Sequence, residues 1–294
     1  MDVHLIDGTY ELFRHFYAVP SAKDANGQEV AAVRGVLTSV LSMFERGATH
    51  LGVATDHIVE SFRNDLYPGY KTSEGVPQEL LSQFPILEET LGAMGVMVWP
   101  MVYFEADDAL ASAASNASKD GSVNQVLICT PDKDLGQCVR AQKVVCLDRR
   151  KNAIVDEDAV RARFGVGPRS VPDWLALVGD SADGFPGLSG WGRQSTSAVL
   201  AHYGHVDAIP DDIADWDPEV IRVVRSAPKL AARLATERDS AMLFRLLATL
   251  RIDRTLLNDV DELRWHGPGP GFANTCRYLR DESLAGRVAA LRGS

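Results

Sequence analysis

Short apolar runs alternate with longer amphipathic stretches over roughly the first 150 residues of the chain. Residues 31–47 and 77–95 carry apolar side chains at spacings of three and four and end in glycine, which is typical of amphipathic helices. The short runs are rich in β-branched residues, as buried strands are, and they occupy residues 3–6, 50–55, 95–100, 125–130 and 143–147. This alternation predicts an α/β fold with a doubly wound, mostly parallel sheet.

The strand pattern stops in the second half of the chain, where helical pattern replaces it. Turns rich in glycine separate the helical stretches, of which the longest runs from Lys229 to Leu250. The run GPGPG at residues 267–271 predicts a loop or linker, and residues 277–291 predict a closing helix. We therefore expect two domains, an α/β domain at residues 1–165 and a helical domain at residues 166–294.

Acidic side chains follow four of the predicted strands. The carboxyl ends of parallel strands form the functional crevice of open α/β sheets, so these side chains are expected to gather at one edge. An aspartate after a strand also begins turns and caps helices, which is the ordinary explanation for any single one. Four repetitions favour a shared site instead. The residues are Asp7 after the first strand, Asp56 after the second, Glu105, Asp107 and Asp108 after the third, and Asp132 and Asp134 after the fourth.

The motif EADD at residues 105–108 allows two explanations on its own. Acidic residues in the first turn of a helix accept hydrogen bonds from free amides, so a crowded helix cap is one of them. Three carboxylates in four positions repel one another unless a cation or hydrogen bonds hold them, so a metal ligand set is the other. Acids at the other strand ends favour hard divalent ions, Mg²⁺ or Mn²⁺, because softer metals prefer Cys or His.

A further acidic pair lies in the second half of the chain, in the segment LALVGDSADGFPGLSGWG. Asp180 and Asp183 are three residues apart and could share a helical face. Glycines follow the pair and precede the helical pattern of STSAVLAHY, so backbone amides and a helix N-terminus could approach a phosphate there. A plain turn is the alternative for a glycine run taken alone. The glycines are Gly184, Gly187, Gly190 and Gly192.

The net charge of −10 argues against a nucleic-acid partner unless the acidic residues are concentrated in one place. Setting aside the nine acidic side chains named above from the total of 40 leaves 31 against 30 basic ones. The excess negative charge is then local, and a metal could neutralise it.

Cysteine and histidine spacing gives no sign of a zinc site or a disulfide framework. The chain has no secretory leader pattern and no apolar window of about eighteen residues, so we expect a cytoplasmic protein without a membrane segment. The cysteines lie mostly in apolar or strand-like runs and are expected to be reduced, structural thiols; they are Cys129, Cys138, Cys146 and Cys276.

Five separated motifs together resemble the 5′ nuclease family, which comprises the flap endonucleases and the 5′→3′ exonuclease domain of bacterial DNA polymerase I. The motifs are LIDGTYELFR, FRNDLYPGYK, EADD, TPDKD and GDSADGFPGLSGWG, and they occur in the family's order over roughly residues 1–250. The resemblance implies a PIN-like α/β domain followed by a helical DNA-binding domain with a glycine-rich helix-three-turn-helix. It also implies two or more Mg²⁺ or Mn²⁺ ions, and a K⁺ ion at the helix-three-turn-helix.

The resemblance assigns roles to individual residues. Phe13 is expected to stack on a terminal base, Arg14 and Arg63 to contact phosphate, and Lys71, at the base of a flexible arch, to steady the scissile phosphate. The implied catalytic residues are Lys71, Arg14, Asp7, Asp56 and Asp107. The implied metal ligands are Asp7, Asp56, Glu105, Asp107, Asp108, Asp132, Asp134, Asp180 and Asp183. The implied DNA-binding residues are Phe13, Arg14, Arg63, Tyr70, Lys71, Gly187, Gly190, Gly192 and Arg193.

The chain departs from the family pattern at three positions. Glu74 stands where the family usually has an arginine, and Gln194, beside Arg193, stands where the glycine-rich element usually has a lysine. Gly184 replaces a common asparagine. Because two cations that would face phosphate are missing, we expect weaker binding of phosphate than is usual in the family. The metal ligand set itself is expected to be complete.

The resemblance implies a structure-specific 5′ nuclease that hydrolyses DNA near a 5′ end, flap or nick in primer removal or repair. We expect a monomer, and a stand-alone enzyme because no polymerase sequence follows before Ser294. One alternative is a non-catalytic or weakly active DNA-junction-binding protein, which Glu74 and Gln194 would suit. Another is a PIN-type endoribonuclease, against which the glycine-rich helical domain argues.

Overall fold

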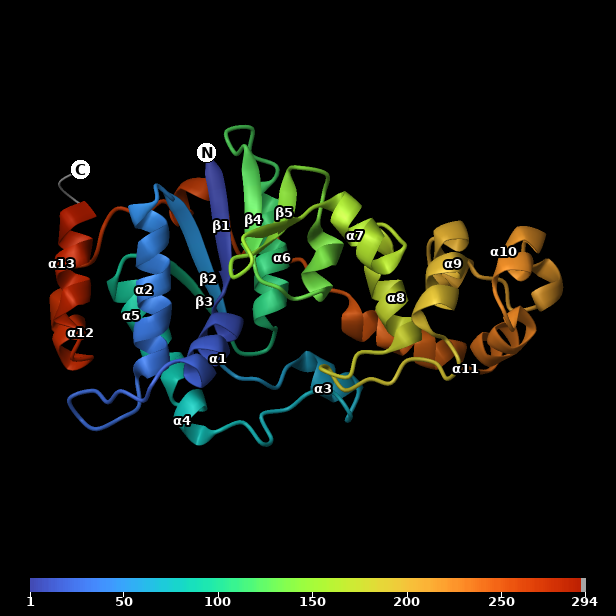
Figure 1. The fold of residues 1–294 in the computed structure, drawn as a ribbon, viewed down its shortest axis with the longest axis horizontal. Coiled ribbons are helices and arrows are strands. Elements are labelled where there is room, and N and C mark those ends of the chain that lie inside the picture. The colour runs from blue at the N-terminus through green and yellow to red at the C-terminus, as the bar shows by residue number, and fades with distance from the viewer. Residues whose placement is uncertain (292–294) are drawn as a thin grey trace. The chain divides into compact units, whose positions relative to one another are not determined.

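A computed structural model describes residues 1–291, which form two compact units (Figure 1). Unit 1 consists of Met1–Ser61, Ser73–Thr130 and the chain from Arg251 onward. Unit 2 consists of Phe62–Thr72 and Pro131–Leu250. Each unit is therefore assembled from separate stretches of the chain. The predicted helical domain ends in residues 292–294, which lie outside the described residues, and the predicted division at residue 165 stays a prediction.

Four parallel strands form the sheet of unit 1, in the order β3-β2-β1-β4. Every neighbouring pair is parallel, with Val3 opposite His50 and Val126, and Gly52 opposite Met97. The predicted parallel sheet is confirmed, and each strand begins and ends within two residues of its predicted bounds. The strands are β1 (Asp2–Asp7), β2 (His50–Asp56), β3 (Met97–Met101) and β4 (Gln125–Cys129).

Helices cover both faces of this sheet. The consecutive residues Leu5 and Ile6 point to opposite faces of β1, and both are fully buried. Helix α6 packs against all four strands, while α1 and α5 contact β2 and α2 packs on α1 and α5. The helices are α1 (Gly8–Ala18), α2 (Ala31–Glu45), α4 (Gln78–Leu81), α5 (Gln83–Ala93) and α6 (Ala106–Ala117).

The C-terminal part of unit 1 differs from the predicted single closing helix. It forms two helices, α12 (Phe272–Tyr278) and α13 (Glu282–Leu291), after a short 3-10 turn η5 (Val260–Leu263). Arg280 has a left-handed φ of 53°, which a continuous helix does not allow, and it separates the two helices. Residues 267–271 form the predicted loop.

Unit 2 contains one antiparallel hairpin followed by helices. Strand β5 (Val144–Asp148) was predicted, whereas β6 (Ala153–Val155), which pairs with it, was not. Three residues with an exposed Ile154 are too short for a periodic signal. Within residues 1–291, no named strand follows Val155, as predicted.

The helices of unit 2 include the predicted long one. Helix α11 (Ala227–Ala248) covers most of residues 229–250 and kinks at Glu237, where φ is −117° and ψ is 24°. The shorter elements are α3 (Phe62–Leu66), η1 (Asp134–Cys138), α7 (Glu157–Phe164), η2 (Pro168–Ser170), α8 (Val171–Val178), α9 (Arg193–Tyr203), η3 (Val206–Ala208), η4 (Ile213–Asp215) and α10 (Pro218–Val223).

Two further expectations can be compared with the described residues. All four cysteines are buried and free, as predicted. None of the helices in residues 1–291 combines the length and the apolar character needed to cross a bilayer.

Candidate functional site

Asp7 ends β1 and begins α1, and hydrogen bonds fix both of its carboxylate oxygens. Its Oδ1 accepts from the Tyr10 amide at 2.8 Å, which caps the helix. Its Oδ2 accepts from the Thr130 hydroxyl at 2.9 Å, just beyond the neighbouring strand β4. The carboxylate is 6% exposed. The strand-to-helix junction therefore holds Asp7 at the carboxyl edge of the sheet in a single orientation.

Asp56 ends the adjacent strand β2 and lies at the start of α6. Its Oδ1 accepts from the Ala106 amide at 2.7 Å, and its own amide donates to the Thr9 hydroxyl at 2.8 Å. The free amides of a helix N-terminus carry partial positive charge, which favours a carboxylate in this position. The helix after β3 is thus capped by an acid from β2, and the acids of three strand ends lie at one edge of unit 1.

The acidic residues of the EADD motif, at residues 105–108, differ in their contacts at the start of α6. Asp108 is 2% exposed, and its Oδ2 accepts from the Glu105 amide at 3.0 Å while its Oδ1 accepts from the Arg251 amide at 2.8 Å. The Glu105 Oε1 accepts from the Ser61 hydroxyl at 2.7 Å. Asp107 is half-buried on the first turn of α6. The capping explanation therefore holds for Asp108, whose metal-ligand role stays a prediction.

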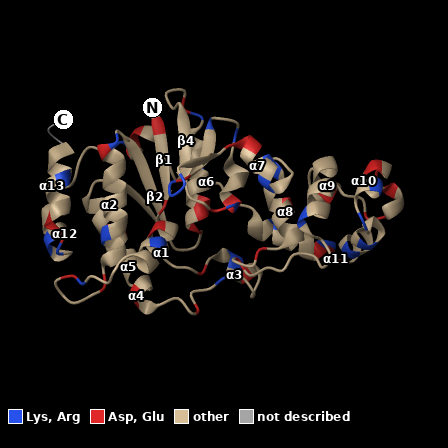
Figure 2. Cartoon of the chain, in the orientation of Figure 1, with Lys and Arg blue, Asp and Glu red and all other residues tan. Residues whose placement is uncertain are grey.

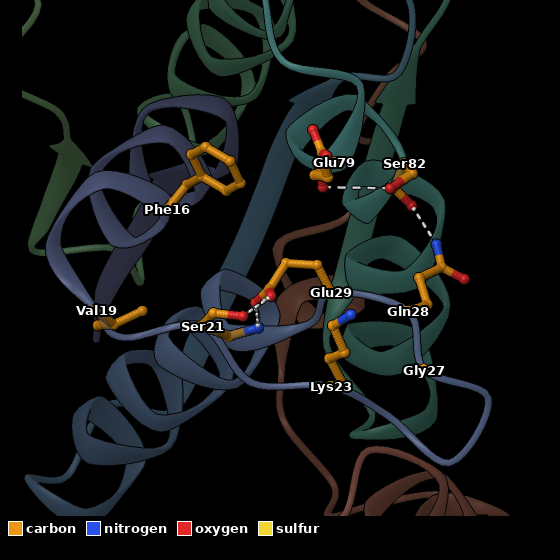
Figure 3. Close-up of a pocket in the computed structure, with 10 residues that line it drawn as sticks. Phe16, Val19, Ser21, Lys23, Gly27, Gln28, Glu29, Glu79 and Ser82 are labelled. Carbon is orange, nitrogen blue, oxygen red and sulfur yellow. Dashed lines mark hydrogen bonds between the residues drawn. The ribbon is translucent and has the colours of Figure 1, made fainter.

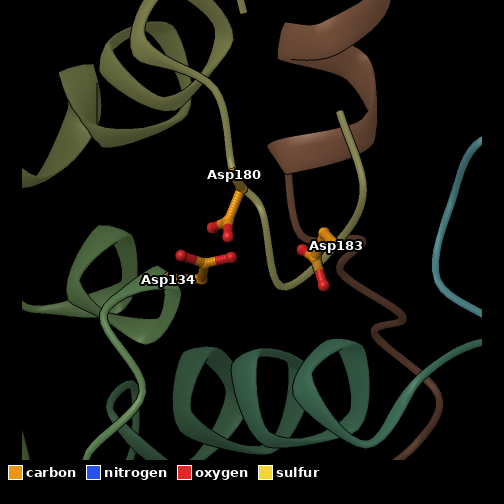
Figure 4. Close-up of side chains that lie close together, drawn as sticks. All are labelled: Asp134, Asp180 and Asp183. Carbon is orange, nitrogen blue, oxygen red and sulfur yellow. The ribbon is translucent and has the colours of Figure 1, made fainter. Parts of the chain in front are cut away.

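In unit 2, three aspartates form a compact cluster. Carboxylate oxygens of Asp134, Asp180 and Asp183 lie within 4.8 Å of one another, and Figure 4 shows the side chains directed at a common centre. We name these three residues the aspartate cluster. Asp134 begins η1, and the amide of Asp134 donates to the Asp132 Oδ1 at 2.8 Å, so Asp132 lies beside the cluster on an exposed turn.

Asp180 and Asp183 do not share a helical face, so that expectation was wrong. Helix α8 ends before them, and the backbones of Asp180 and Phe185 exchange hydrogen bonds of 2.8 and 3.1 Å across a tight turn. The Asp180 side chain also accepts from the Ala182 amide at 3.0 Å. The turn, which Gly184 supports with a φ of +86°, brings the two carboxylates together.

Burial makes the charge on Asp134 costly. Desolvation, followed by repulsion from Asp132, raises the pKa of Asp134 well above its ordinary value. Its Oδ1 is buried and accepts no hydrogen bond in the described residues, and the nearest cation is the Lys133 ammonium at 3.4 Å. Lys133 also donates a hydrogen bond to Asp180. Burial alone would lower the pKa of Lys133, but attraction to Asp134 and Asp180 raises it.

The donor set of the aspartate cluster fits a hard divalent cation. All three side chains offer carboxylate oxygens, which Mg²⁺ and Mn²⁺ prefer, and none offers sulfur or nitrogen. The buried Asp134 Oδ1 is an acceptor without a hydrogen-bond donor, which an ion would satisfy. The cluster can therefore hold a metal ion with little rearrangement of its backbone.

Lys71 lies beside the aspartate cluster. Its ammonium is 3.3 Å from the Asp183 Oδ1, and its amide donates to the Asp183 carbonyl at 3.0 Å. A Cβ on Gly184 would lie 2.1 Å from the Gly69 carbonyl oxygen, so this glycine lets residues 69–71 pack against the turn. Tyr70 is 4% exposed, whereas Glu74 is exposed. Lys71 therefore lies beside the aspartate cluster, and its role toward a phosphate stays a prediction.

The glycine-rich segment connects α8 to α9. Gly187 has a φ of +68°, and a Cβ there would lie 2.3 Å from the Gly179 amide nitrogen. Gly192 caps α9, so Arg193 and Gln194 occupy its exposed first turn. The Arg193 guanidinium lies 5.2 Å from the centre of the Trp174 ring. A helix N-terminus with an arginine and open amides is suited to phosphate.

Substitution Gly187→Ala is expected to destabilise this segment strongly. The alanine would combine a left-handed φ with a backbone clash, at a cost of about 2 kcal/mol or more. We expect a lower melting temperature. Gly121→Ala is a matched control because a Cβ at Gly121 meets no atom within 4 Å. An unchanged melting temperature for Gly187→Ala would show that the backbone relaxes without cost.

The predicted DNA contacts of α1 lie in different surroundings. Phe13 is half-buried, and its ring meets Phe84 edge to face with centroids 6.4 Å apart. The Arg14 guanidinium hydrogen-bonds to Glu11 and contacts His15. Glu11 is only 2% exposed, and sequence analysis did not single it out. Its spacing of three from Arg14 on a helix was the available signal.

Arg63 is placed differently from a typical phosphate contact. It is 1% exposed, its Nε donates to the Leu247 carbonyl at 2.7 Å, and its Nη2 donates to the Thr249 carbonyl at 3.3 Å. The last carbonyls of a helix carry partial negative charge and favour a cation. Arg63 therefore stabilises the end of α11, and its contact with phosphate stays a prediction.

A pocket of about 530 Å³ lies beside α1 and the loop before α2 (Figure 3). Glu29 organises it by accepting hydrogen bonds from the amides of Ala22 at 3.0 Å and Ala31 at 2.9 Å. Phe16 and Lys23 also line the pocket. In unit 2, basic residues lie among acidic ones on α7 and α11 (Figure 2).

Family comparison covers nearly the whole chain. Residues 2–165 match the family described as 5′-3′ exonuclease, N-terminal resolvase-like domain, and residues 166–270 match 5′-3′ exonuclease, C-terminal SAM fold. The chain is 30% identical to the 5′-3′ exonuclease of Aquifex aeolicus over 79% of this chain and 80% of that protein. It is 32% identical to DNA polymerase I of Pseudomonas aeruginosa over 88% of this chain, and it spans 28% of that polymerase.

Solved structures share the fold. T5 5′-exonuclease with bound zinc has a TM-score of 0.66 at 15% identity, with 100% of this chain and 99% of that chain covered. The catalytic core of Rad2 in complex with a DNA substrate has a TM-score of 0.64 at 16% identity, with 98% of this chain and 91% of that chain covered. These similarities confirm the predicted fold class, an α/β sheet domain with a helical part.

Proposed function

Because this chain belongs to the 5′-3′ exonuclease family, we propose that it is a divalent-metal-dependent nuclease that hydrolyses DNA near a 5′ end, flap or nick. The observation that carries the proposal is the aspartate cluster. Its Asp134 Oδ1 is buried and accepts no hydrogen bond in the described residues, and Lys71 lies beside the cluster. Carboxylates, a buried acceptor and a neighbouring ammonium are the groups that phosphodiester hydrolysis needs. No serine, cysteine or histidine nucleophile is required.

Two or more Mg²⁺ or Mn²⁺ ions on the nine carboxylates would lower the pKa of the attacking water and stabilise the leaving 3′ oxygen. Water adds to phosphorus as the bond to the 3′ oxygen breaks, which leaves a 5′-phosphate on one product and a 3′-hydroxyl on the other. In unit 1 the ligands are Asp7, Asp56, Glu105, Asp107 and Asp108. In unit 2 they are Asp132, Asp134, Asp180 and Asp183.

The remaining roles belong to residues that face substrate. Lys71 exchanges Asp183 for the scissile phosphate, Arg14 contacts a neighbouring phosphate, and Phe13 stacks on the terminal base. A base stacked on an aromatic ring contributes about 1 to 3 kcal/mol without sequence preference. The glycine turn, with Gly187, Gly190, Gly192 and Arg193, binds duplex backbone and a K⁺ ion. Because Glu74 and Gln194 replace cations, the affinity for the DNA backbone is weaker than is usual in the family.

The biological setting of the proposal is primer removal or repair in the cytoplasm by a monomer. Relatives named DNA polymerase I support a setting in DNA synthesis, since their name states a DNA polymerase. The two alternative functions receive less support. Both family matches are to 5′-3′ exonucleases, and the second match covers the helical part of the chain, which argues against an endoribonuclease. A junction-binding protein and a PIN-type endoribonuclease remain as outcomes of the test.

A cleavage assay on 5′-flap, nicked, single-stranded and RNA substrates tests the proposal. With Mg²⁺ or Mn²⁺ we expect cleavage of flap and nicked DNA near the 5′ end, and EDTA should stop it. Cleavage of RNA alone would indicate the endoribonuclease. Tight flap binding without cleavage in either metal would indicate the junction-binding protein. Ca²⁺ serves as the control, because it supports carboxylate binding without the tight octahedral geometry of Mg²⁺.

A further inference from the structure

Lys133 places an ammonium group against two residues of the aspartate cluster. The group lies 3.4 Å from the Asp134 Oδ1 and donates a hydrogen bond to Asp180. Its two partners are 7% and 4% exposed, whereas the Lys133 side chain is 29% exposed. This is therefore not an exposed surface ion pair, whose contribution would be small. The ammonium contacts both Asp134 and Asp180, which are two of the three carboxylates of the aspartate cluster.

Two lysines together neutralise part of the cluster's charge. Asp132 and the three cluster aspartates supply four carboxylates, while Lys133 and Lys71 supply two positive charges within 3.4 Å of Asp134 and Asp183. The two lysines differ in attachment. Lys71 belongs to residues 62–72, and Lys133 lies directly between Asp132 and Asp134 in the sequence. The Lys133 ammonium is thus tethered beside the cluster by the same turn that carries two proposed ligands.

We propose that Lys133 is an internal competitor for the divalent ion at the aspartate cluster. The inference rests on the metal binding proposed above. When no divalent ion is bound, the Lys133 ammonium holds Asp134 and Asp180 in place and reduces their mutual repulsion. A divalent ion binds only when it displaces that ammonium. The flexible four-carbon stem of lysine allows the ammonium to swing toward solvent, which the planar and rigid guanidinium of arginine would do less readily.

The competition has two opposite consequences. It stabilises the metal-free fold, because like charges in a buried cluster raise one another's free energy unless a cation lies between them. It also weakens the intrinsic affinity for Mg²⁺ or Mn²⁺, because the free energy of the lysine contacts is lost when the ion binds. A residue that only contacts substrate would have neither effect in the absence of DNA.

Lys133→Met, which keeps the side-chain length and removes the charge, tests the proposal without DNA. Mn²⁺ binding to the full chain is measured by titration calorimetry at pH 8, and melting temperature is measured in EDTA and in Mn²⁺. We expect Mn²⁺ to bind about tenfold more tightly to the variant, an effect of the size of one close charge pair. We also expect a lower melting temperature in EDTA and a larger rise with Mn²⁺ than in wild type.

Two further variants make the result specific. Lys133→Arg keeps the charge and is expected to bind Mn²⁺ no more tightly than wild type. Lys151→Met is the matched control, because Lys151 is 79% exposed and pairs with Asp148 at 3.5 Å. It should change neither quantity.

Two results would overturn the proposal: Mn²⁺ affinity that is unchanged or weaker in Lys133→Met, or an unchanged melting temperature in EDTA. Failure of the proposed nuclease would look different. In that case wild type and Lys133→Met could still differ in Mn²⁺ affinity, while neither would cleave flap or nicked DNA.

Discussion

Replacing Asp134 with asparagine is expected to abolish DNA cleavage and, without divalent ions, to stabilise the fold. The variant replaces a buried carboxylate of the aspartate cluster with an uncharged amide. Several kcal/mol of transition-state stabilisation depend on the ions that such ligands hold, so the single-turnover rate should fall on the order of a thousandfold. Binding of a flap substrate in Ca²⁺ should persist, because other residues are proposed to contact the DNA.

The stability effect follows from the raised pKa of Asp134. Since its folded pKa lies above the ordinary value of 3.8, the folded state keeps a proton that the unfolded state releases. The stabilising contribution is complete below about pH 3.8 and is lost as pH rises through the folded pKa. The amide that replaces this carboxyl in Asp134→Asn has no such proton to lose. In EDTA, the melting temperature of the variant minus that of wild type should therefore increase with pH across this window.

Divalent ions should reverse the sign of this difference. Mn²⁺ binds the charged carboxylate of wild type and stabilises its fold by mass action, whereas the variant lacks one ligand. The measurement is a series of melting curves from pH 4 to pH 8 in EDTA and in Mn²⁺. Asp120→Asn serves as a control, because Asp120 is a half-buried aspartate outside the cluster whose Oδ1 accepts from the Ser122 amide at 2.7 Å. A variant that is less stable than wild type in EDTA at pH 8 would contradict the buried, unsatisfied state of Asp134.

The sequence predicted the strands of unit 1 because each is a short apolar run. Strands β1, β2 and β4 are buried over most of their length, whereas β3 is mostly half-buried. The sequence also predicted that the acids after those strands would gather at one edge, since a parallel sheet places the carboxyl ends of its strands at the same edge. Strand β6 was missed because its stability comes from pairing with β5, which a three-residue window cannot show. The predicted single helix over residues 277–291 was wrong for a related reason. One left-handed residue, Arg280, ends the first helix, and an apolar periodicity does not reveal the conformation of a single residue.

The candidate site shows a similar division. Spacing alone suggested a helical face for Asp180 and Asp183, but backbone pairing of Asp180 with Phe185 builds a turn instead. The burial of Arg63 depends on the carbonyls of Leu247 and Thr249, which are far from it in sequence. Lys133 is a charged residue between two aspartates, and only the fold shows which carboxylates it meets. Such contacts are long-range, and residue type and spacing do not determine them.

Asp107 and Asp108 are neighbours in one motif, yet their alanine variants are expected to fail in opposite ways. Both Asp108 oxygens accept from backbone amides, those of Glu105 and Arg251. Asp108→Ala would leave these amides without their acceptor, at a cost of about 2 to 4 kcal/mol in the free energy of unfolding. Asp107 is half-buried in the first turn of α6, where loss of a carboxylate costs within about 1 kcal/mol.

The expected results therefore separate stability from catalysis. Asp107→Ala should melt near wild type in EDTA, bind a flap substrate in Ca²⁺, and lose cleavage in Mg²⁺ on the order of a thousandfold, because it removes a proposed ligand. Asp108→Ala should melt well below wild type in EDTA. Asp108→Asn should lie between the two in stability, since an amide has one carbonyl oxygen and can replace only one of the two acceptors. Near-normal cleavage by Asp107→Ala would place the chemistry elsewhere. A wild-type melting temperature for Asp108→Ala would contradict the role of Asp108 as an acceptor that stabilises these two amides.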